Sequence, residues 1–241
     1  MSVVGGTSVI DDLPEVARRY LGHAIAPSVT LADTVELEIR GSTLQKGRWF
    51  SFTAHERLEA GVGFHWAARL RYGPLVLAGV DQLRSGQASL DFRLFGLLPF
   101  LHASGPDVVR AARGRLAIES LWLPSTAHPE LGARWSTPGP AEPNRAEVRL
   151  TVDREEAVLT LIIAPSGRLE SACVSRWGDP TEYGTYGLHP FGGVLEGEAS
   201  FGDYTIPARL RAGWGFGTPT YRESFRFEIT GASFSRSLPR A

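Results

Sequence analysis

The stretch VELEIRGSTLQKGRWFSFTAHERLEAGVGFHWAARLR, residues 35–71, decides the fold class. Apolar and polar side chains alternate along it in three runs, which begin at Val35, Phe50 and Phe64. A period of two places successive side chains on opposite faces of a strand. Glycines between the runs mark turns, so the stretch predicts a β-meander with one buried face.

The same alternation returns in the second half of the chain, in runs that begin at Ala146, Leu159, Ile206 and Phe225. Between the halves lies the Pro- and Gly-rich segment STPGPAEPN, residues 136–144, which we expect to be a loop. We therefore expect strands over about residues 30–95 and 145–235, with this loop as the best candidate for a boundary.

Two other segments have helical periodicity. DLPE at residues 12–15 and SGPD at residues 104–107 resemble capping boxes, in which a side-chain oxygen accepts hydrogen bonds from first-turn N–H groups. An apolar stripe at helical spacing follows each of them. These patterns predict amphipathic helices over about residues 12–22 and 105–122.

The order of elements is therefore helix, strands, helix, strands. One large curved antiparallel sheet, or open half-barrel, with the two helices packed in its concavity would bury both helical stripes. Two small separate sandwiches are the alternative layout. We favour the single sheet, with residues 1–241 forming one domain, a mainly β (α+β) protein.

Composition narrows the range of functions. The 241 residues are 43% hydrophobic and carry a formal net charge of −1, without a basic run. This balance argues against nucleic acid and against an anionic membrane as partners. No stretch is apolar enough for a membrane span, and the first sixteen residues do not resemble a signal peptide, so we expect a cytoplasmic protein. The sequence leaves the oligomeric state open.

Several chemistries have no motif in this chain. Cys173 is the single cysteine, which excludes an intramolecular disulfide and a Cys-x-x-Cys metal site, and its alternating surroundings favour a buried structural thiol over a nucleophile. The six histidines are scattered singly, and the glycine-spaced segment 213–217 has no helix after it. We expect neither a metal nor a cofactor.

The segment from Arg176 to Thr218 mixes aromatic and polar side chains with glycines and prolines, as expected around a concave site. Within it we expect the mouth of a pocket to be formed by a polar and aromatic group: Arg176, Trp177, Asp179, Tyr183, Tyr186 and His189. Three of them also have a simpler interpretation: Asp179 as a turn cap, Trp177 as cover for the core edge and His189 as a hydrogen-bonded loop residue.

Glu119 is the sharpest single candidate. Its spacing from Ala112, Leu116 and Leu123 places a carboxylate on the apolar stripe of the second helix. Facing a dry cavity, it would have a raised pKa and could act as a general acid or base. The alternative is a structural ion pair with a buried arginine, either Arg176 or Arg209.

Arg209 and Arg211 share one face of a strand and could clamp an anion, or they could be solvated charges on its outer face. We expect the ligand-binding set to include Arg209 and three tryptophans: Trp66, Trp122 and Trp214.

Three motifs carry a family resemblance: ASGPDVVRAARGRLAIESLWLPS (103–125), SRWGDP (175–180) and FGDYTIPARLRAGWGFGT (201–218). The chain resembles an uncharacterised, largely actinobacterial protein family with RWGD and FGGYTIPSRLRAGW segments. Asp203 replaces the second glycine of that pattern. In element order the chain is also similar to the outer-membrane lipoprotein carrier fold, a half-barrel with a helical lid, which implies an acyl or other apolar ligand.

Two functions follow, and a third interpretation stays open. The first is binding of a hydrophobic small molecule, such as a lipid, isoprenoid or polyketide-like compound, between the curved sheet and the second helix. The second is a metal- and nucleotide-independent isomerase, cyclase or hydrolase that uses Glu119, Asp179 or His189 for acid–base chemistry. The third is a structural or interaction domain whose own side chains fill the cavity.

Overall fold

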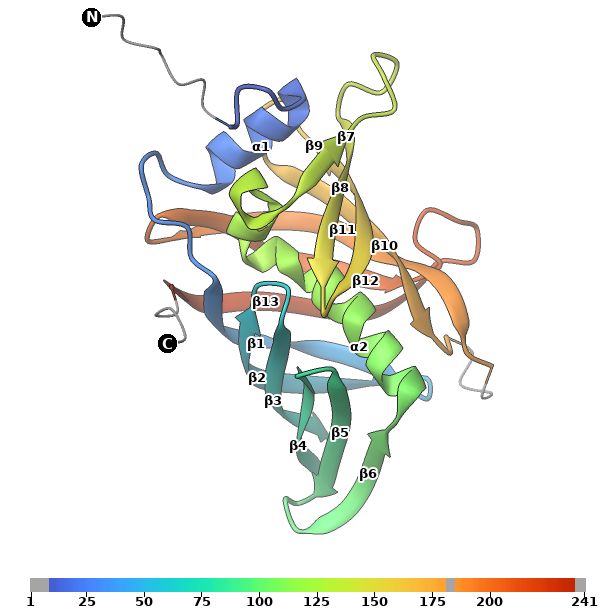
Figure 1. Ribbon diagram of the computed structural model, residues 1–241. Helices are drawn as coiled ribbons and strands as arrows, with labels where there is room; N and C mark the ends of the chain where they lie inside the picture. The colour runs from blue at the N-terminus through green and yellow to red at the C-terminus, as the bar shows by residue number, and fades with distance from the viewer. Residues whose placement is uncertain (1–8, 181–184, 237–241) are drawn as a thin grey trace, which may run out of the picture.

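The computed structural model describes residues 9–180 and 185–236, and these residues form one continuous antiparallel sheet of 13 strands with two α-helices (Figure 1). The first six strands are β1 (Thr34–Gln45), β2 (Arg48–Glu59), β3 (Gly63–Tyr72), β4 (Leu75–Arg84), β5 (Gln87–Leu94) and β6 (Leu98–Ser104). The other seven are β7 (Arg134–Ser136), β8 (Arg145–Val152), β9 (Glu155–Ile163), β10 (Leu169–Gly178), β11 (Gly187–Phe201), β12 (Tyr204–Trp214) and β13 (Arg222–Ser235).

The strand order is β6-β5-β4-β3-β2-β1-β13-β12-β11-β10-β9-β8-β7. Two meanders, β1–β6 and β7–β13, are thus joined where the first strand pairs with the last, from Thr34 opposite Ser235 to Thr43 opposite Phe225. The predicted single curved sheet is confirmed, and the alternative of two sandwiches is wrong. The loop at residues 136–144 lies between β7 and β8, near one edge of this sheet.

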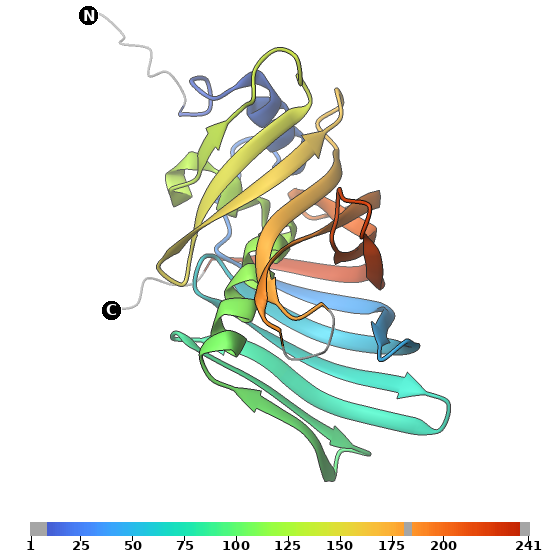
Figure 2. The same ribbon diagram turned by 90° about the vertical axis from the view of Figure 1, so that its right-hand side faces the viewer.

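Both helices pack on the concave side of the sheet. Helix α1 (Glu15–Ala24) contacts β12 and β8, and α2 (Pro106–Glu119) lies across β10 (Figures 1 and 2). The 3₁₀ segments η1 (Ser120–Trp122), η2 (Pro124–Ala127) and η3 (Pro129–Leu131) continue from α2 towards β7. One hydrophobic core joins the inner faces of both meanders with both helices.

The two predicted capping boxes do not form. Helix α1 begins after Pro14, and α2 begins after Gly105, whose φ of 104° favours glycine. Neither N-cap residue makes a side-chain capping hydrogen bond. The proline next to each start fixes the entry of the chain into the helix instead.

Gly114 lets α2 approach the sheet closely. A Cβ atom at this position would lie 2.7 Å from Cγ of Arg176 on β10. A larger residue would therefore push the helix away from the strand, so this glycine sets how near α2 lies to Arg176.

The sheet curls until distant hairpins meet, and we call this region the closed end. The turn between β8 and β9 reaches the turn between β2 and β3, where the backbone N–H of Asp153 donates to the carbonyl of Gly61 at 2.8 Å. Arg113 of α2 holds the same turn, with Nε 2.8 Å from Oδ2 of Asp153 and a further ion pair to Glu155.

At the opposite ends of β1–β6, no backbone hydrogen bond among the described residues joins a turn of this meander to a turn of the other. We call this region the open end and define it by three hairpin turns: β1–β2 (45–48), β3–β4 (72–75) and β5–β6 (94–98). Figure 2 shows the first two projecting from one side of the sheet and the third at its foot.

Candidate functional site

A cavity of about 970 Å³ lies between the concave face of the sheet and α2. Apolar side chains from both meanders line it, because the alternation of each strand turns every second residue inward. The main contributors are Ile39, Phe52, Trp66, Leu70, Leu77, Phe92, Ala172, Phe191, Leu195, Leu210, Phe225 and Phe227. Helix α2 and η1 add Ile118, Leu121 and Trp122. A volume of this size is in the range of small-molecule sites.

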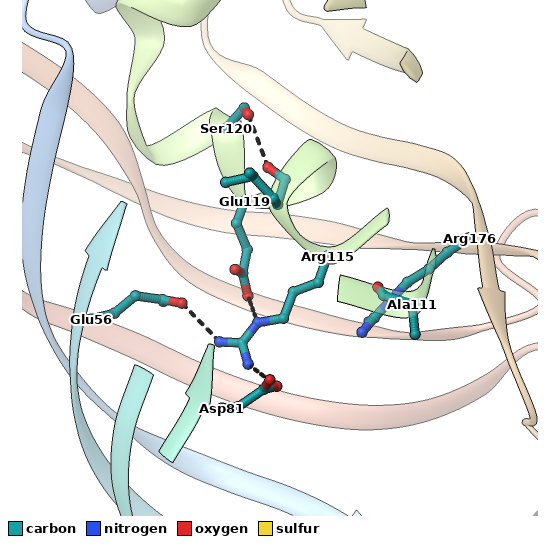
Figure 3. Close-up of polar contacts among 8 residues, drawn as sticks. Glu56, Asp81, Ala111, Arg115, Glu119, Ser120 and Arg176 are labelled. Atoms are coloured by element: carbon teal, nitrogen blue, oxygen red, sulfur yellow. Dashed lines mark hydrogen bonds and ion pairs between the residues drawn. The ribbon is translucent and has the colours of Figure 1, made fainter. Parts of the chain in front are cut away.

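One polar cluster interrupts the apolar wall, and Arg115 of α2 is its centre (Figure 3). Its Nε lies 2.7 Å from Oε1 of Glu119, Nη1 lies 2.6 Å from Oδ2 of Asp81, and Nη2 lies 2.8 Å from Oε1 of Glu56. Glu119 follows Arg115 by four residues, which places both on one face of the helix. Three carboxylates from α2, β2 and β4 therefore surround one guanidinium.

Each carboxylate uses only one of its oxygens in this cluster. Glu56 Oε2, Asp81 Oδ1 and Glu119 Oε2 are buried and have no hydrogen-bond partner. All three residues line the cavity. When ionised, the free oxygens of Asp81 and Glu119 can only accept hydrogen bonds, so this part of the wall is suited to a donor group such as a hydroxyl or an amine. Glu56, whose raised pKa favours its protonated form, can also donate.

Burial dominates the electrostatics of the cluster. It raises the pKa of Glu56 well above the usual glutamate value, and the nearby Glu119 carboxylate adds to this effect while Arg115 opposes it. Burial likewise raises the pKa of Glu119, against the lowering influence of Arg115 and Arg176. The surrounding carboxylates outweigh burial for Arg115 and raise its pKa, so it stays charged.

Two aromatic rings support the guanidinium of Arg115. Its Cζ lies 4.5 Å from the ring centroid of Phe64 and 5.0 Å from that of Trp66. Stacking of this kind and three ion pairs hold the side chain in one orientation. The positive charge is thus fixed in the cavity wall.

Arg176 is the second cationic residue of the wall. Its Nε donates to the carbonyl of Ala111 at 3.3 Å, and its guanidinium lies over Phe191 at 4.7 Å and Trp214 at 5.3 Å. Burial and the charge of Arg115 lower the pKa of Arg176 to about 10. Within the described residues no carboxylate lies within 4.0 Å of it.

The cavity reaches solvent at the open end. Its lining includes Gln45, Lys46 and Arg48 of the β1–β2 turn, all exposed, and Phe100 and Leu101 of β6, also exposed. The mouth of the cavity therefore lies beside the hairpin turns of β1–β2 and β5–β6. None of the described residues 177–180 and 185–189 lines the cavity.

The structure places four of the predicted site residues in the cavity wall: Glu119, Trp66, Trp122 and Arg176. Trp214 does not line the cavity but packs against Phe191, at 5.0 Å between ring centroids, and under Arg176. The Nε1 of Trp122 is buried without a hydrogen-bond partner, so it is a further polar atom of this region.

The other predicted residues lie elsewhere. Trp177 donates from Nε1 to Asp107 at 2.9 Å and carries Arg110 over its ring, at the start of α2. Asp179 follows the end of β10, Tyr186 is exposed, and His189 packs edge-on to Trp214 at 6.3 Å. Arg209 is exposed on the outer face of β12, where Arg211 pairs with Glu196. Tyr183 lies outside the described residues.

The partner of Glu119 is Arg115, and neither Arg209 nor Arg176 forms the ion pair that the sequence suggested. Sequence reasoning also missed Glu56 and Asp81. The signals were present: Glu56 continues the inward series Phe50, Phe52, Ala54, and Asp81 occupies an inward position of β4. A carboxylate at an inward position of a strand is buried and needs a partner, so it indicates a polar site inside the fold.

The described residues have three further properties. They contain no group of three or more His, Cys, Asp or Glu side chains that could hold a metal ion. None of their helices is both long and apolar enough to cross a membrane. Burial raises the pKa of Cys173, which makes its thiolate harder to form.

Three solved structures have a similar course of the chain. The first is a Vibrio parahaemolyticus domain described as outer membrane lipoprotein-sorting, with 8% identity, coverage of 95% of this chain and 94% of that chain, and a TM-score of 0.47. The second is a LolA superfamily protein from Nitrosomonas europaea, with 10% identity, coverage of 93% of both chains and a TM-score of 0.44. The third is a DUF1329 family protein from Desulfovibrio piger, with 8% identity, coverage of 96% of this chain and 95% of that chain, and a TM-score of 0.47. At these identities the likeness concerns shape alone.

A search of curated proteins found no match. A family model does match, over residues 5–227, which is most of the chain and contains all three quoted motifs. The uncharacterised family predicted from those motifs is thereby confirmed. The chain belongs to the family of unknown function DUF6544.

Proposed function

We propose that this protein binds a hydrophobic small molecule, such as a lipid, isoprenoid or polyketide-like compound, between its curved sheet and α2. One observation carries the proposal: a cavity of about 970 Å³ with a mainly apolar lining that reaches exposed residues at the open end. Each methylene group moved from water into such a lining contributes about 0.8 kcal/mol. Burial of its apolar surface alone would therefore bind an elongated apolar ligand, and no chemical reaction is needed.

The polar cluster narrows the class of ligand. Its unpartnered oxygens on Glu56, Asp81 and Glu119 lie in the cavity wall, and leaving them unpaired is unfavourable. A hydroxyl or amine at one end of the ligand would satisfy them. The preferred ligand is thus amphipathic, with its donor group at the Arg115 cluster and its apolar body towards the open end.

A matched pair of tryptophan substitutions tests this proposal. Leu195 lines the cavity, and its neighbour Val194 is exposed on the other face of β11. Leu195→Trp fills the cavity and should weaken binding of dansyl-undecanoic acid at least tenfold in a fluorescence titration, whereas Val194→Trp should not. Circular dichroism of both variants checks that they fold.

Native mass spectrometry gives an independent readout. The protein purified from its source cells should carry an apolar molecule that is absent from Leu195→Trp. Equal dansyl-undecanoate binding by wild type and both variants, with no molecule that co-purifies, would contradict the proposal.

A second candidate function rests on the buried carboxyl groups. Glu119 and Glu56 have raised pKa values in a cavity wall, as general acids and bases often do. In this alternative, the protein is a metal- and nucleotide-independent isomerase, cyclase or hydrolase, and Glu119 is its acid–base group. Asp179 and His189, the other candidates from the sequence, do not line the cavity.

The Glu119→Gln variant separates the two functions. It keeps the shape of the side chain, so dansyl-undecanoate binding should persist. If the protein is an enzyme, wild type should convert the co-purifying molecule to a new product, detected by mass spectrometry, and Glu119→Gln should not. An unchanged molecule after incubation with wild type would leave binding as the function. The cytoplasmic location expected from the sequence also stays a prediction, which fractionation of source cells checks.

A further inference from the structure

The open end carries a group of large apolar side chains that the fold leaves in solvent. On the β5–β6 hairpin Leu97 is 77% exposed and Phe100 is 62% exposed, and Phe95 and Leu98 are each more than half exposed. Tyr72 and Leu75 of the β3–β4 turn are exposed as well. Scattered exposed apolar residues are ordinary, but a contiguous group marks an interaction site.

Contacts between the hairpins show that these residues form one surface. The guanidinium of Arg48 lies 5.4 Å from the ring centroid of Tyr72, and the rings of Phe50 and Tyr72 are 5.2 Å apart. The N–H of Phe95 donates to the carbonyl of Val76 at 2.7 Å. The three turns of the open end are therefore neighbours.

This surface is basic. The chain segments around the three turns, residues 42–52, 69–78 and 92–101, contain no Asp or Glu but include Lys46, Arg48, Arg71 and Arg93. These four side chains are exposed. Within the described residues, no carboxylate lies within 4.0 Å of Lys46, Arg48 or Arg71, while Arg93 pairs with Asp91 at 3.4 Å.

We propose that the open end docks on an anionic membrane surface. Exposed leucines and aromatic rings beside unpaired cationic groups are the combination that inserts into the boundary between headgroups and acyl chains. A second copy of the same surface is disfavoured, because it would bring Lys46, Arg48 and Arg71 against their own counterparts.

The sequence had argued against an anionic membrane because the net charge is −1 and no basic run occurs. The fold changes that conclusion locally. The basic residues lie on three separate hairpins, and only the alternating direction of the strands gathers them at one end. Net charge does not report such a surface.

The docking surface surrounds the mouth of the cavity. Lys46, Arg48, Phe100 and Leu101 belong to both. A docked protein would therefore present its cavity directly to the lipid phase. This extends the proposed function, but the surface stands without it, because its residues are exposed whether or not the cavity takes a ligand.

Co-sedimentation of the full chain with vesicles tests the proposal. We expect binding to vesicles of phosphatidylcholine mixed with phosphatidylglycerol, and much weaker binding to pure phosphatidylcholine. Raising the salt from about 0.1 M to about 1 M shortens the screening length from about 10 Å to about 3 Å, so binding to the anionic vesicles should decrease. Leu97→Ser/Leu98→Ser should bind at least tenfold more weakly than wild type.

The matched control is Val62→Ser/Leu131→Ser, which replaces two exposed apolar residues outside the open end and should bind as wild type. Absence of vesicle binding by wild type, or equal binding by both double variants, would overturn the proposal. So would a dimer in light scattering that Leu97→Ser/Leu98→Ser dissociates without any vesicle binding by wild type. Leu195→Trp should still bind vesicles and Leu97→Ser/Leu98→Ser should still bind dansyl-undecanoate, so this proposal and the proposed function fail separately.

Discussion

The two ends of the curved sheet differ in how their charged groups are paired and in how much apolar surface they expose. Towards the closed end, charged groups are paired: Arg115 is largely buried and is held by three carboxylates, and the partly exposed Arg113 fastens the β8–β9 turn. At the open end, Lys46, Arg48 and Arg71 are exposed beside leucines in solvent, and no carboxylate of the described residues lies within 4.0 Å of them. The difference indicates that one end holds the fold together and the other end is left available for binding.

Removal of Arg115 should have the largest effect on stability. Arg115→Met leaves three buried carboxylates without their cation, and the free energy of unfolding should fall by about 3–5 kcal/mol. Arg113→Met breaks partly exposed pairs at the same end and should cost about 1 kcal/mol or less. Urea denaturation measures both. Equal losses would mean that the buried cluster is no more important than a surface ion pair.

The pH dependence of stability should sharpen the same comparison, with a smaller effect. The folded protein keeps a proton on Glu56 at pH values where the unfolded chain has released it, because burial raises the pKa of Glu56. Stability should therefore fall as the pH rises above about 4.3, the ordinary glutamate value, towards the raised pKa.

Glu56→Gln removes this titration and should reduce the slope between pH 5 and pH 8 in urea denaturation series, leaving the part that the raised pKa of Glu119 contributes. The control is Glu36→Gln, an exposed carboxylate on β1, which should keep the slope of wild type. A slope unchanged by Glu56→Gln would show that Glu56 does not hold the proton.

The smallest effect on stability is expected at the open end. Leu97→Ser/Leu98→Ser replaces exposed side chains and should change the free energy of unfolding by no more than about 0.5 kcal/mol. Leu83→Ala, at a fully buried leucine near the end of β4, should cost about 2–5 kcal/mol. Thermal unfolding followed by circular dichroism compares them. A large loss in the double serine variant would show that these leucines serve the core.

The sequence predicted the architecture because hydrophobic period is a local property. The alternation from Val35 to Leu70 indicated inward faces that the structure confirms, with Val35, Phe52 and Phe64 all buried. The starts of the helices were harder to predict. The SGPD pattern predicts a side-chain cap at Ser104, whereas the chain enters α2 through the positive φ of Gly105. Local pattern does not decide between such competing starts.

The site was only partly predictable. Glu119 was found because a carboxylate on an apolar helical stripe is visible in one segment. Arg115, four residues earlier in the same helix, was visible in that segment too, although the predicted partners were other arginines. Glu56 and Asp81 were not visible, since they come from β2 and β4, whose meeting with α2 depends on how the helix crosses the sheet. The charge of the open end was hidden for the same reason, because its residues are far apart along the chain.

The seam between β1 and β13 has a consequence for biosynthesis. The partners Thr34 and Ser235 are far apart along the chain, so the centre of the sheet cannot be completed until β13 leaves the ribosome. Until then β1 and β12 each present a free edge, and such edges recruit other chains. A nascent or C-terminally truncated chain should therefore be the species most prone to aggregate and most dependent on chaperones.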